Sequence, residues 1–258
     1  MTNMKCRKAG EDGVSESIGF LLIFTMVIVG IGLVTLYGYP LLLQQQTSAD
    51  EQIMEKNMIV LQNDMKSLAY KTVPYKETML NIGGGSLTAY DSTITGPRFR
   101  IYDGITEFLP ENRTGDLRYY STSAGVDISL QNGAVVMRKL VEPGSTMLAQ
   151  PRWFYDAQTE TMVINVICLN SNGNISRSGV GTVQMELGDP YSAVYSVTNG
   201  VFVDYTPDTG QDYTNGWNNY LSNTMDMTCG GSPTLTCVFN KPISTLVSCH
   251  RSSRDARD

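Results

Sequence analysis

The chain has 258 residues and a formal net charge of −6, and only 17% of its residues are charged, against about 25% in ordinary soluble domains. This acidic balance argues against a nucleic-acid-binding surface, which is basic, so we expect no nucleic acid among the partners. The sole histidine, His250, excludes a metal site built from several histidines.

The first predicted element is an apolar helix. Residues Ile18 to Leu43 contain no charged side chain. At about 1.5 Å per residue they form a helix long enough to cross a hydrocarbon core of about 30 Å. We therefore predict a basic leader over residues 1–13 and a transmembrane helix over 14–43. Pro40 lies near the end of this helix and predicts a bend there.

Charges on the two sides of the span predict its orientation. Lys5, Arg7 and Lys8 precede it, and Asp50 and Glu51 follow it. Because cytoplasmic flanks are enriched in lysine and arginine, we expect a single-pass protein of the cell membrane with a cytoplasmic N-terminus and an extracellular C-terminal domain. The apolar run is too long for the core of a conventional secretory signal, so the helix should be retained.

The start of the chain resembles the class III signal of archaeal type IV pilins. The resemblance is carried by the basic leader and by VSESIGFLLIFTMVIVGIGLV, with Val14-Ser15-x-x-Ile18-Gly19 as its specific part. The stretch LQNDMKSLAYKTVPYKETMLNIGGGSL is similar to the region after the helix in an uncharacterised, pilin-like archaeal membrane family. The resemblance implies three partners: membrane lipid, a prepilin-type peptidase, and copies of the chain or other pilin-like subunits.

The resemblance also implies a processing site, because the peptidase of such proteins cuts before the apolar helix. The cut would fall between Gly13 and Val14, with Gly10 and Glu11 as the alternative pair. Glu16 is the candidate for the glutamate that pairs with a neighbouring subunit's free amine in bacterial-type pilins, although neither cut gives it the usual register. Its other interpretation is an interfacial residue near a helix N-terminus, where the helix dipole favours an anion.

We predict a juxtamembrane helix over residues 44–74, which ends at Pro74. Ile53 and Val60 would widen its apolar stripe toward an ordinary buried face. The helix packs either against partner helices or against the chain's own domain. The stripe itself follows alternating spacings of four and three residues, at Met54, Met58, Leu61, Met65 and Leu68.

From residue 75 to residue 249 the spacing of the apolar residues changes from the period of a helix to that of strands. This pattern predicts about eight to ten short strands. Asn132-Gly133 and Asn199-Gly200 each lie between two apolar strands and predict hairpins. The fold class is therefore α+β: a long N-terminal helix followed by a mostly antiparallel β domain, either a sandwich or a curled sheet. Residues 250–258 are expected to be a flexible tail.

Four cysteines follow the span, at Cys168, Cys229, Cys237 and Cys249. They are compatible with two disulfides in an oxidising compartment, in any of three connectivities, or with four thiols. Cys229 and Cys237 flank the hairpin-like stretch GGSPTLT, which favours this pair first.

The sequence offers no convincing catalytic, cofactor or metal site, so we expect a protein that is not an enzyme. Cys249 and His250 are adjacent, which does not by itself bring their side chains into catalytic contact. Gly83-Gly84-Gly85 lacks the Lys-Ser/Thr of a phosphate loop and predicts a turn or bulge. One group of carboxylates would suit calcium or a polar surface loop, without the spacing of an EF-hand, at Asp204, Asp208, Asp212 and Asp226.

Two sequons begin at Asn112 and Asn174, both in polar stretches where we expect loops open to glycosylation. The aromatic segments WFYD and YTNGWNNY predict either a sugar- or surface-binding patch or ordinary core packing.

Together these features favour a non-enzymatic, pilin-like surface protein, held by its N-terminal helix and able to join a type IV pilus-like filament for adhesion or surface interaction. The alternative is a single-pass membrane-anchored ectodomain that binds a ligand or envelope partner without polymerising.

Overall fold

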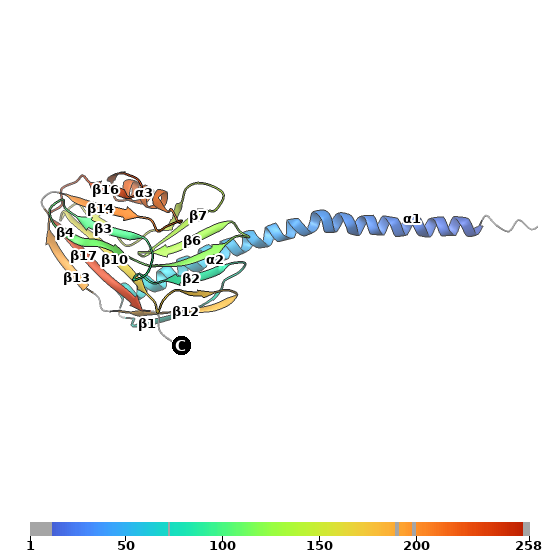
Figure 1. The fold of residues 1–258 in the computed structure, drawn as a ribbon, viewed down its shortest axis with the longest axis horizontal. Coiled ribbons are helices and arrows are strands. Elements are labelled where there is room, and N and C mark those ends of the chain that lie inside the picture. Colours follow the sequence, from blue (N-terminus) through green and yellow to red (C-terminus); the bar gives the residue numbers. More distant parts are fainter. Residues whose placement is uncertain (1–11, 72, 189–190, 198–199, 255–258) are drawn as a thin grey trace, which may run out of the picture. The chain divides into compact units, whose positions relative to one another are not determined.

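The structure, a computed structural model, describes residues 12–71, 73–188, 191–197 and 200–254, and within these ranges the side chains from 17 to 246. The chain divides into two compact units, Met1–Ser48 and Ala49–Asp258. The first unit contains helix α1 (Asp12–Leu33), a π-helical turn (Val34–Gly38) and the start of helix α2 (Tyr39–Tyr70). Figure 1 labels α1, α2 and many of the strands that follow.

Pro40 does not end the helix, which continues from Ser17 to Tyr70 over 54 residues. A proline has no N–H to donate and its ring crowds the carbonyl four residues earlier, here that of Leu36. The residues whose hydrogen bonds are disturbed form the wider π-helical turn at Val34–Gly38. The irregularity expected at Pro40 therefore takes the form of a π segment inside a continuous helix.

The second unit is built from three sheets, which we call A, B and C. Sheet A has the order β1 (Tyr75–Asn81), β12 (Val180–Leu187), β17 (Thr245–Arg254), β10 (Thr161–Asn170) and β9 (Phe154–Asp156), and β13 (Tyr191–Ser196) also pairs with β17. Sheet B has the order β11 (Ile175–Arg177), β2 (Ser86–Tyr90), β5 (Asp116–Ser121), β6 (Val126–Gln131), β7 (Ala134–Lys139) and β8 (Thr146–Ala149). Sheet C has the order β15 (Met227–Gly230), β16 (Leu235–Phe239), β14 (Val201–Thr206), β3 (Arg98–Tyr102) and β4 (Glu107–Arg113).

The expected α+β class is confirmed, with one long N-terminal helix and a mostly antiparallel β domain. Among the described strands, β10 and β17 form the one parallel pair, in which Thr161 lies opposite Thr245 and Asn170 opposite Arg254. The described part of the domain has more strands than the eight to ten predicted. Some of the additional ones are short, such as the three-residue β9 and β11, and three residues are too few to show an alternating pattern.

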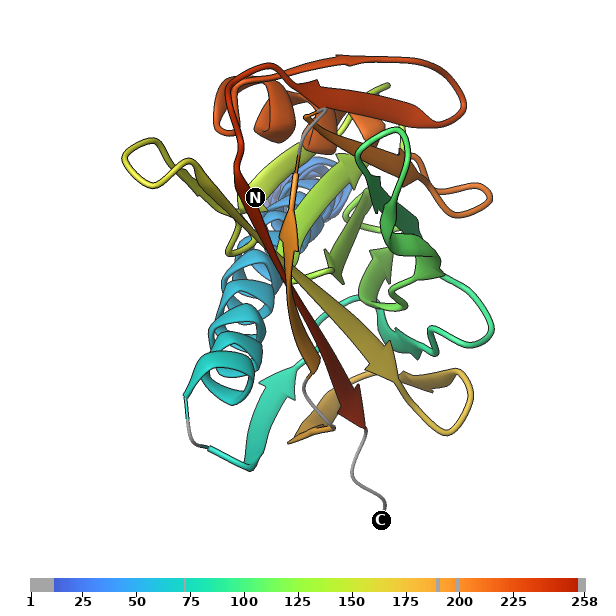
Figure 2. The same cartoon turned by 90° about the vertical axis from the view of Figure 1, so that its left-hand side faces the viewer.

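Two local expectations are wrong. The strands flanking Asn199-Gly200 do not form a hairpin, because β13 pairs with β17 in sheet A while β14 pairs with β3 and β16 in sheet C. Residues 250–254 of the expected tail belong to β17, which lies alongside β10 as far as Arg254, and residues 255–258 lie outside the described residues. In both places pairing with distant strands decides the structure, and a local turn or charge pattern cannot report it. Figure 2 shows β17, in dark red, running along the domain.

Two hydrophobic clusters form the interior of the domain. The first, which we call the helix core, joins α2 to sheet B and includes Met58, Tyr119 and Ile128. The second, the aromatic core, lies among sheet C, strand β10 and a third helix, α3 (Thr214–Asn223), and includes Phe99 and Trp217. Sheet B takes part in both clusters through alternate residues of β7, with Val135 in the helix core and Val136 in the aromatic core.

The apolar stripe of α2 is confirmed as the face that packs on the chain's own domain. All five of its predicted residues are at most 3% exposed, whereas Ile53 and Val60 are 45% and 47% exposed and do not widen it. On the same helix the Gln62 amide is buried and donates to the carbonyl oxygens of Gly133 and Gln150, at 2.7 and 2.9 Å. Among the described residues, the docking face is therefore narrow, apolar and fixed by one amide.

Gly83-Gly84-Gly85 forms a turn, as expected, and it carries the chain from sheet A to sheet B. A Cβ on Gly83 would lie 2.6 Å from a carboxylate oxygen of Asp50 on α2. A Cβ on Gly85 would lie 2.6 Å from both the Tyr119 ring and the Tyr120 carbonyl oxygen. The turn is glycine-rich because the helix and strand β5 leave no room for side chains.

The docking face can be tested by cutting back one methionine. We expect Met58→Ala to lower the free energy of unfolding by about 2–5 kcal/mol, because the residue is fully buried and its removal leaves a cavity. The matched variant Ile53→Ala, on the exposed side of the same helix, should change it by less than about 1 kcal/mol. Denaturant unfolding of the full chain in micelles measures both, and equal losses would contradict the docking.

The tight turn offers a second test. We expect Gly85→Ala to destabilise the domain by about 1–3 kcal/mol, because the added methyl group meets backbone as well as the Tyr119 ring. Gly230→Ala is the matched control, since a Cβ there meets nothing within 4 Å. The melting temperature of Gly85→Ala should be lower than that of the control. Equal melting temperatures would show that the turn can accommodate a methyl group at residue 85.

Candidate membrane anchor and candidate sites of the β domain

The apolar helix of the first unit exposes almost every side chain that it carries. From Ile18 to Leu43 its large apolar side chains are between 44% and 73% exposed. A soluble monomer seldom exposes an apolar patch of more than a few hundred Å². By length and composition this is the one helix, within the described residues, that is able to cross a membrane.

Two hydroxyl side chains in this helix are satisfied internally. Thr25 donates to the carbonyl oxygens of Leu21 and Leu22, and Thr35 donates to that of Ile31 at 2.9 Å. Unsatisfied polar groups cost several kcal/mol in hydrocarbon, and these bonds remove that cost. The segment is therefore suited to lipid in its hydrogen bonding as well as in its composition.

The residues expected at the processing site are only partly described. Gly13, Val14 and Glu16 lie on the backbone of α1, but their side chains fall outside the described set. Gly10 and Glu11 lie outside the described residues altogether. The cut and the role of Glu16 accordingly stay predictions.

A buried ion pair lies on the face of sheet B that is turned away from α2. The Arg118 guanidinium donates to Asp116 Oδ2 through Nε at 2.9 Å and approaches it through Nη2 at 2.7 Å. The Ser129 hydroxyl donates to the same oxygen at 2.7 Å. Burial raises the pKa of Asp116, although Arg118 and Ser129 oppose that shift. The Tyr90 ring lies 4.4 Å from the guanidinium carbon of Arg118.

A second pair continues this polar layer. Arg138 donates through Nε to Asp127 Oδ2 at 3.0 Å, and its guanidinium also lies over the Tyr213 ring. Burial raises the pKa of Tyr213 well above its usual value, and Asp127 adds to the shift. Asp116 and Asp127 are both fully buried. Carboxylates without exposed surface cannot reach a substrate, so we assign this layer to holding the sheets together.

The four aspartates considered for calcium have separate partners. Asp204 lies 3.9 Å from Arg100, Asp208 accepts from the Thr95 hydroxyl, and Asp212 accepts from the Thr214 amide. Asp226 forms an ion pair with Lys241 at 2.8 Å. In the part of the chain that the structure describes, no three acidic, cysteine or histidine side chains come together as a metal site.

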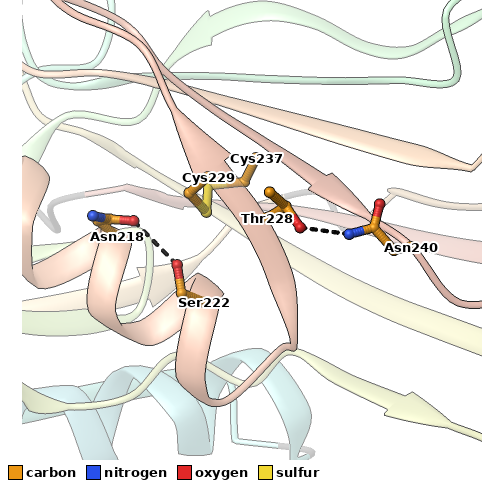
Figure 3. Close-up of a disulfide and its surroundings, with 6 residues drawn as sticks. All are labelled: Asn218, Ser222, Thr228, Cys229, Cys237 and Asn240. Carbon is orange, nitrogen blue, oxygen red and sulfur yellow. Dashed lines mark hydrogen bonds between the residues drawn. A yellow bond between two sulfur atoms is a disulfide. The ribbon is translucent and has the colours of Figure 1, made fainter.

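A disulfide joins Cys229 to Cys237, the pair that the hairpin sequence favours. The two residues lie opposite each other on the antiparallel strands β15 and β16. Figure 3 shows the bond beside helix α3, with the Asn240 amide donating to the Thr228 hydroxyl on the far side. The bond closes a short loop at the edge of sheet C, and the chain-entropy model gives such loops about 2–3 kcal/mol of stabilisation.

Cys168 and Cys249 are placed differently from that pair. Cys168 is buried on β10, where its thiol donates to the Arg113 carbonyl oxygen at 3.7 Å, and burial raises its pKa to about 12. Cys249 and His250 lie on the backbone of β17, opposite Asn165 and Val166, and their side chains fall outside the described set.

The two sequons differ in their surroundings. Asn112 is half-buried on strand β4 and not in the expected loop, and Thr114 of the same sequon is fully buried. Asn174 precedes the edge strand β11 and is exposed, with its side-chain oxygen accepting from the Asp91 amide at 3.2 Å. Of the two, Asn174 is the one that an oligosaccharide can occupy without disturbing the fold.

The aromatic segments belong mainly to the interior, which favours the core-packing interpretation over a binding patch. Trp217 is fully buried, Tyr220 is 3% exposed and Trp153 is 5% exposed. Trp217 lies 4.8 Å, ring centre to ring centre, from Phe99 and 5.8 Å from Trp153. The segment YTNGWNNY contributes Trp217 and Tyr220 from helix α3, and the sequence does not predict this helix because glycine and asparagine favour turns.

These features define the class of the protein. It has an N-terminal apolar helix able to span a membrane, followed by a single sheet-rich domain with a hairpin disulfide. The family model DUF7289, described as a family of unknown function, matches residues 13–253, and the chain belongs to that family. No curated protein and no solved structure matches the chain.

The burial of Cys168 leads to a prediction about its reactivity. With a pKa of about 12, on the order of one thiol in ten thousand is ionised at pH 8, and the thiolate is the reactive form. We expect iodoacetamide at pH 8 to leave Cys168 unmodified in the folded chain and to modify it in denaturant. Peptide mapping by mass spectrometry reports each cysteine separately, and rapid native labelling of Cys168 would contradict its burial.

Proposed function

We propose that this chain is a non-enzymatic, pilin-like surface protein, held in the cell membrane by its N-terminal helix and able to assemble into a type IV pilus-like filament. The observation that carries the proposal is the change of character along one continuous helix. Its first part is apolar on all sides and exposed, and its last part is buried along one face of the β domain.

The exposed part has two suitable coverings, lipid and the equivalent helices of other copies. Gly30 and Gly32 have nothing within 4 Å of their Cβ positions, so a second helix is able to approach the backbone there. A helix that satisfies its own polar groups can exchange one apolar covering for the other at little cost. This supports a reversible passage between membrane and filament.

The basic leader and the acidic flank support a cytoplasmic N-terminus and an external domain. The Cys229–Cys237 disulfide supports the same orientation, because disulfides persist outside the reducing cytosol. In this proposal a prepilin-type peptidase removes the leader on the cytoplasmic side, and the β domain is displayed for adhesion or surface interaction.

A second candidate function is a single-pass anchored domain that binds a ligand or envelope partner and never polymerises. The observation that favours it lies on α2, whose apolar stripe is already covered by the chain's own sheet B. Within the second unit the helix then keeps only isolated apolar residues for a partner, such as Ile53 and Val60.

Processing separates the two candidates. We expect N-terminal mass spectrometry of the chain isolated from its native membranes to find a mature start at Val14, or at Glu11 if the alternative bond is used. The variant Gly13→Arg should abolish the first product, because the peptidase requires a small residue before the bond, and Gly10→Arg should abolish only the second.

A paired assay for filaments completes the test. Sheared surface material should contain the mature chain, and the uncleaved variant should remain in the membrane fraction. An intact Met1 start, together with sheared material that lacks the chain, would contradict the pilin-like proposal and leave the anchored-domain function.

A further inference from the structure

The outer face of sheet C carries an ordered set of polar and aromatic side chains. Alternate residues of its strands point to opposite faces, and those on the inner face, such as Phe99, Val203 and Cys237, are fully buried in the aromatic core. Those on the outer face are half-buried. Their positions are fixed by the pairing of β3, β14 and β16.

The register arranges these outer residues in three rows across the three strands. Arg98 lies opposite Thr206, whose hydroxyl is 2.9 Å from that of Thr234. The next row is Arg100, Asp204 and Thr236, and the third is Tyr102, Phe202 and Val238. The first two rows therefore provide hydrogen-bond donors and acceptors, and the third row is mainly apolar, all on one face of the sheet.

A polar hollow of about 190 Å³ lies over the first two rows. This volume leaves room for one small ring-shaped ligand. Its lining offers guanidinium donors, carboxylate acceptors and hydroxyls that do both, from Arg98, Arg100, Glu111, Asp204, Thr206 and Thr234.

The charges around the hollow nearly cancel. Arg98 lies 3.5 Å from Glu111, and Arg100 forms an ion pair with Glu107 and lies 3.9 Å from Asp204. A charged ligand would meet a like charge beside each opposite one. An uncharged ligand with several hydroxyls avoids that repulsion, because each hydroxyl can donate to a carboxylate and accept from a guanidinium.

Two further features point to a ligand. The Asp204 side chain keeps 15% of its surface exposed, and its Oδ2 lies 3.9 Å from Arg100 Nη1, too far for a hydrogen bond, so this oxygen can still accept one from a ligand. In the adjoining row the Tyr102 and Phe202 rings stack at 5.1 Å and 14°, and the Arg100 guanidinium carbon lies 4.4 Å from the Tyr102 ring centre. The Tyr102 ring therefore lies between Arg100 and Phe202, and this row forms an apolar border beside the polar rows.

We propose that the outer face of sheet C is a binding site for one uncharged sugar residue of a surface glycan. The hydroxyls of the sugar bond to Asp204, Arg98 and Arg100, and its C–H groups lie toward the apolar border formed by Tyr102 and Phe202. The site depends neither on processing nor on filament assembly, so it belongs equally to either candidate function.

The test uses the full chain in dodecylphosphocholine micelles, which contain no sugar headgroup. The probes are the methyl glycosides of glucose, mannose, galactose and N-acetylglucosamine, measured by saturation-transfer difference NMR. We expect at least one probe to receive saturation, with a millimolar dissociation constant typical of a single sugar. Silence from all four probes would overturn the proposal.

Variants locate the binding. Asp204→Asn should weaken it by about tenfold, because an amide replaces a charged acceptor. Asp226→Asn is the matched control, since Asp226 pairs with Lys241 outside the hollow, and it should leave the dissociation constant unchanged. Thr206→Val removes a hydroxyl from the lining while retaining the shape and provides a second variant if Asp204→Asn does not fold.

Two outcomes besides silence decide against the site. Binding that survives both Asp204→Asn and Thr206→Val in folded protein would place the sugar elsewhere. Tighter binding of glucuronate than of methyl glucoside would show that the site selects an anion, contrary to the balanced charges of its lining.

Discussion

The packing of one narrow face of α2 against sheet B is the interaction on which the domain depends. Five apolar side chains at helical spacing provide this face, and each contributes roughly 1.5–3 kcal/mol when fully buried. The Gln62 amide sets how far along the sheet the helix lies, because it bonds to two separate carbonyl oxygens. The glycine turn, the inner residues of β5 and β6, and the crossing from sheet A to sheet B are all arranged around that face.

Much of this could be predicted from the sequence, wherever a physical preference repeats along consecutive residues. The uncharged run from Ile18 to Leu43 requires an apolar environment. The five-residue stripe of α2 requires one buried face. Asn132 and Gly133, both with positive φ, provide the turn between β6 and β7 because such residues tolerate that conformation. The fold class followed from these local rules.

The rest depends on contacts between residues far apart in the chain. The parallel pairing of β10 with β17 joins segments about eighty residues apart, and nothing in Thr245–Arg254 identifies its partner. Helix α3 forms because the aromatic core buries Trp217 and Tyr220, which outweighs the weak helix propensity of its asparagines and glycine. The row of outer residues on sheet C is invisible in sequence, since Arg100, Asp204 and Thr236 become neighbours only through strand pairing.

The place of β17 in sheet A has a consequence for biosynthesis. This strand is the common neighbour of β10, β12 and β13, yet it follows all three in the chain. Sheet A cannot be completed until residues up to Arg254 have left the ribosome, because its central element is the last to be made. The domain therefore remains incomplete, with unpaired strand edges, throughout most of its synthesis, and such edges promote aggregation. A helix that enters the membrane early would keep each unfinished chain apart from its neighbours until the final strand arrives.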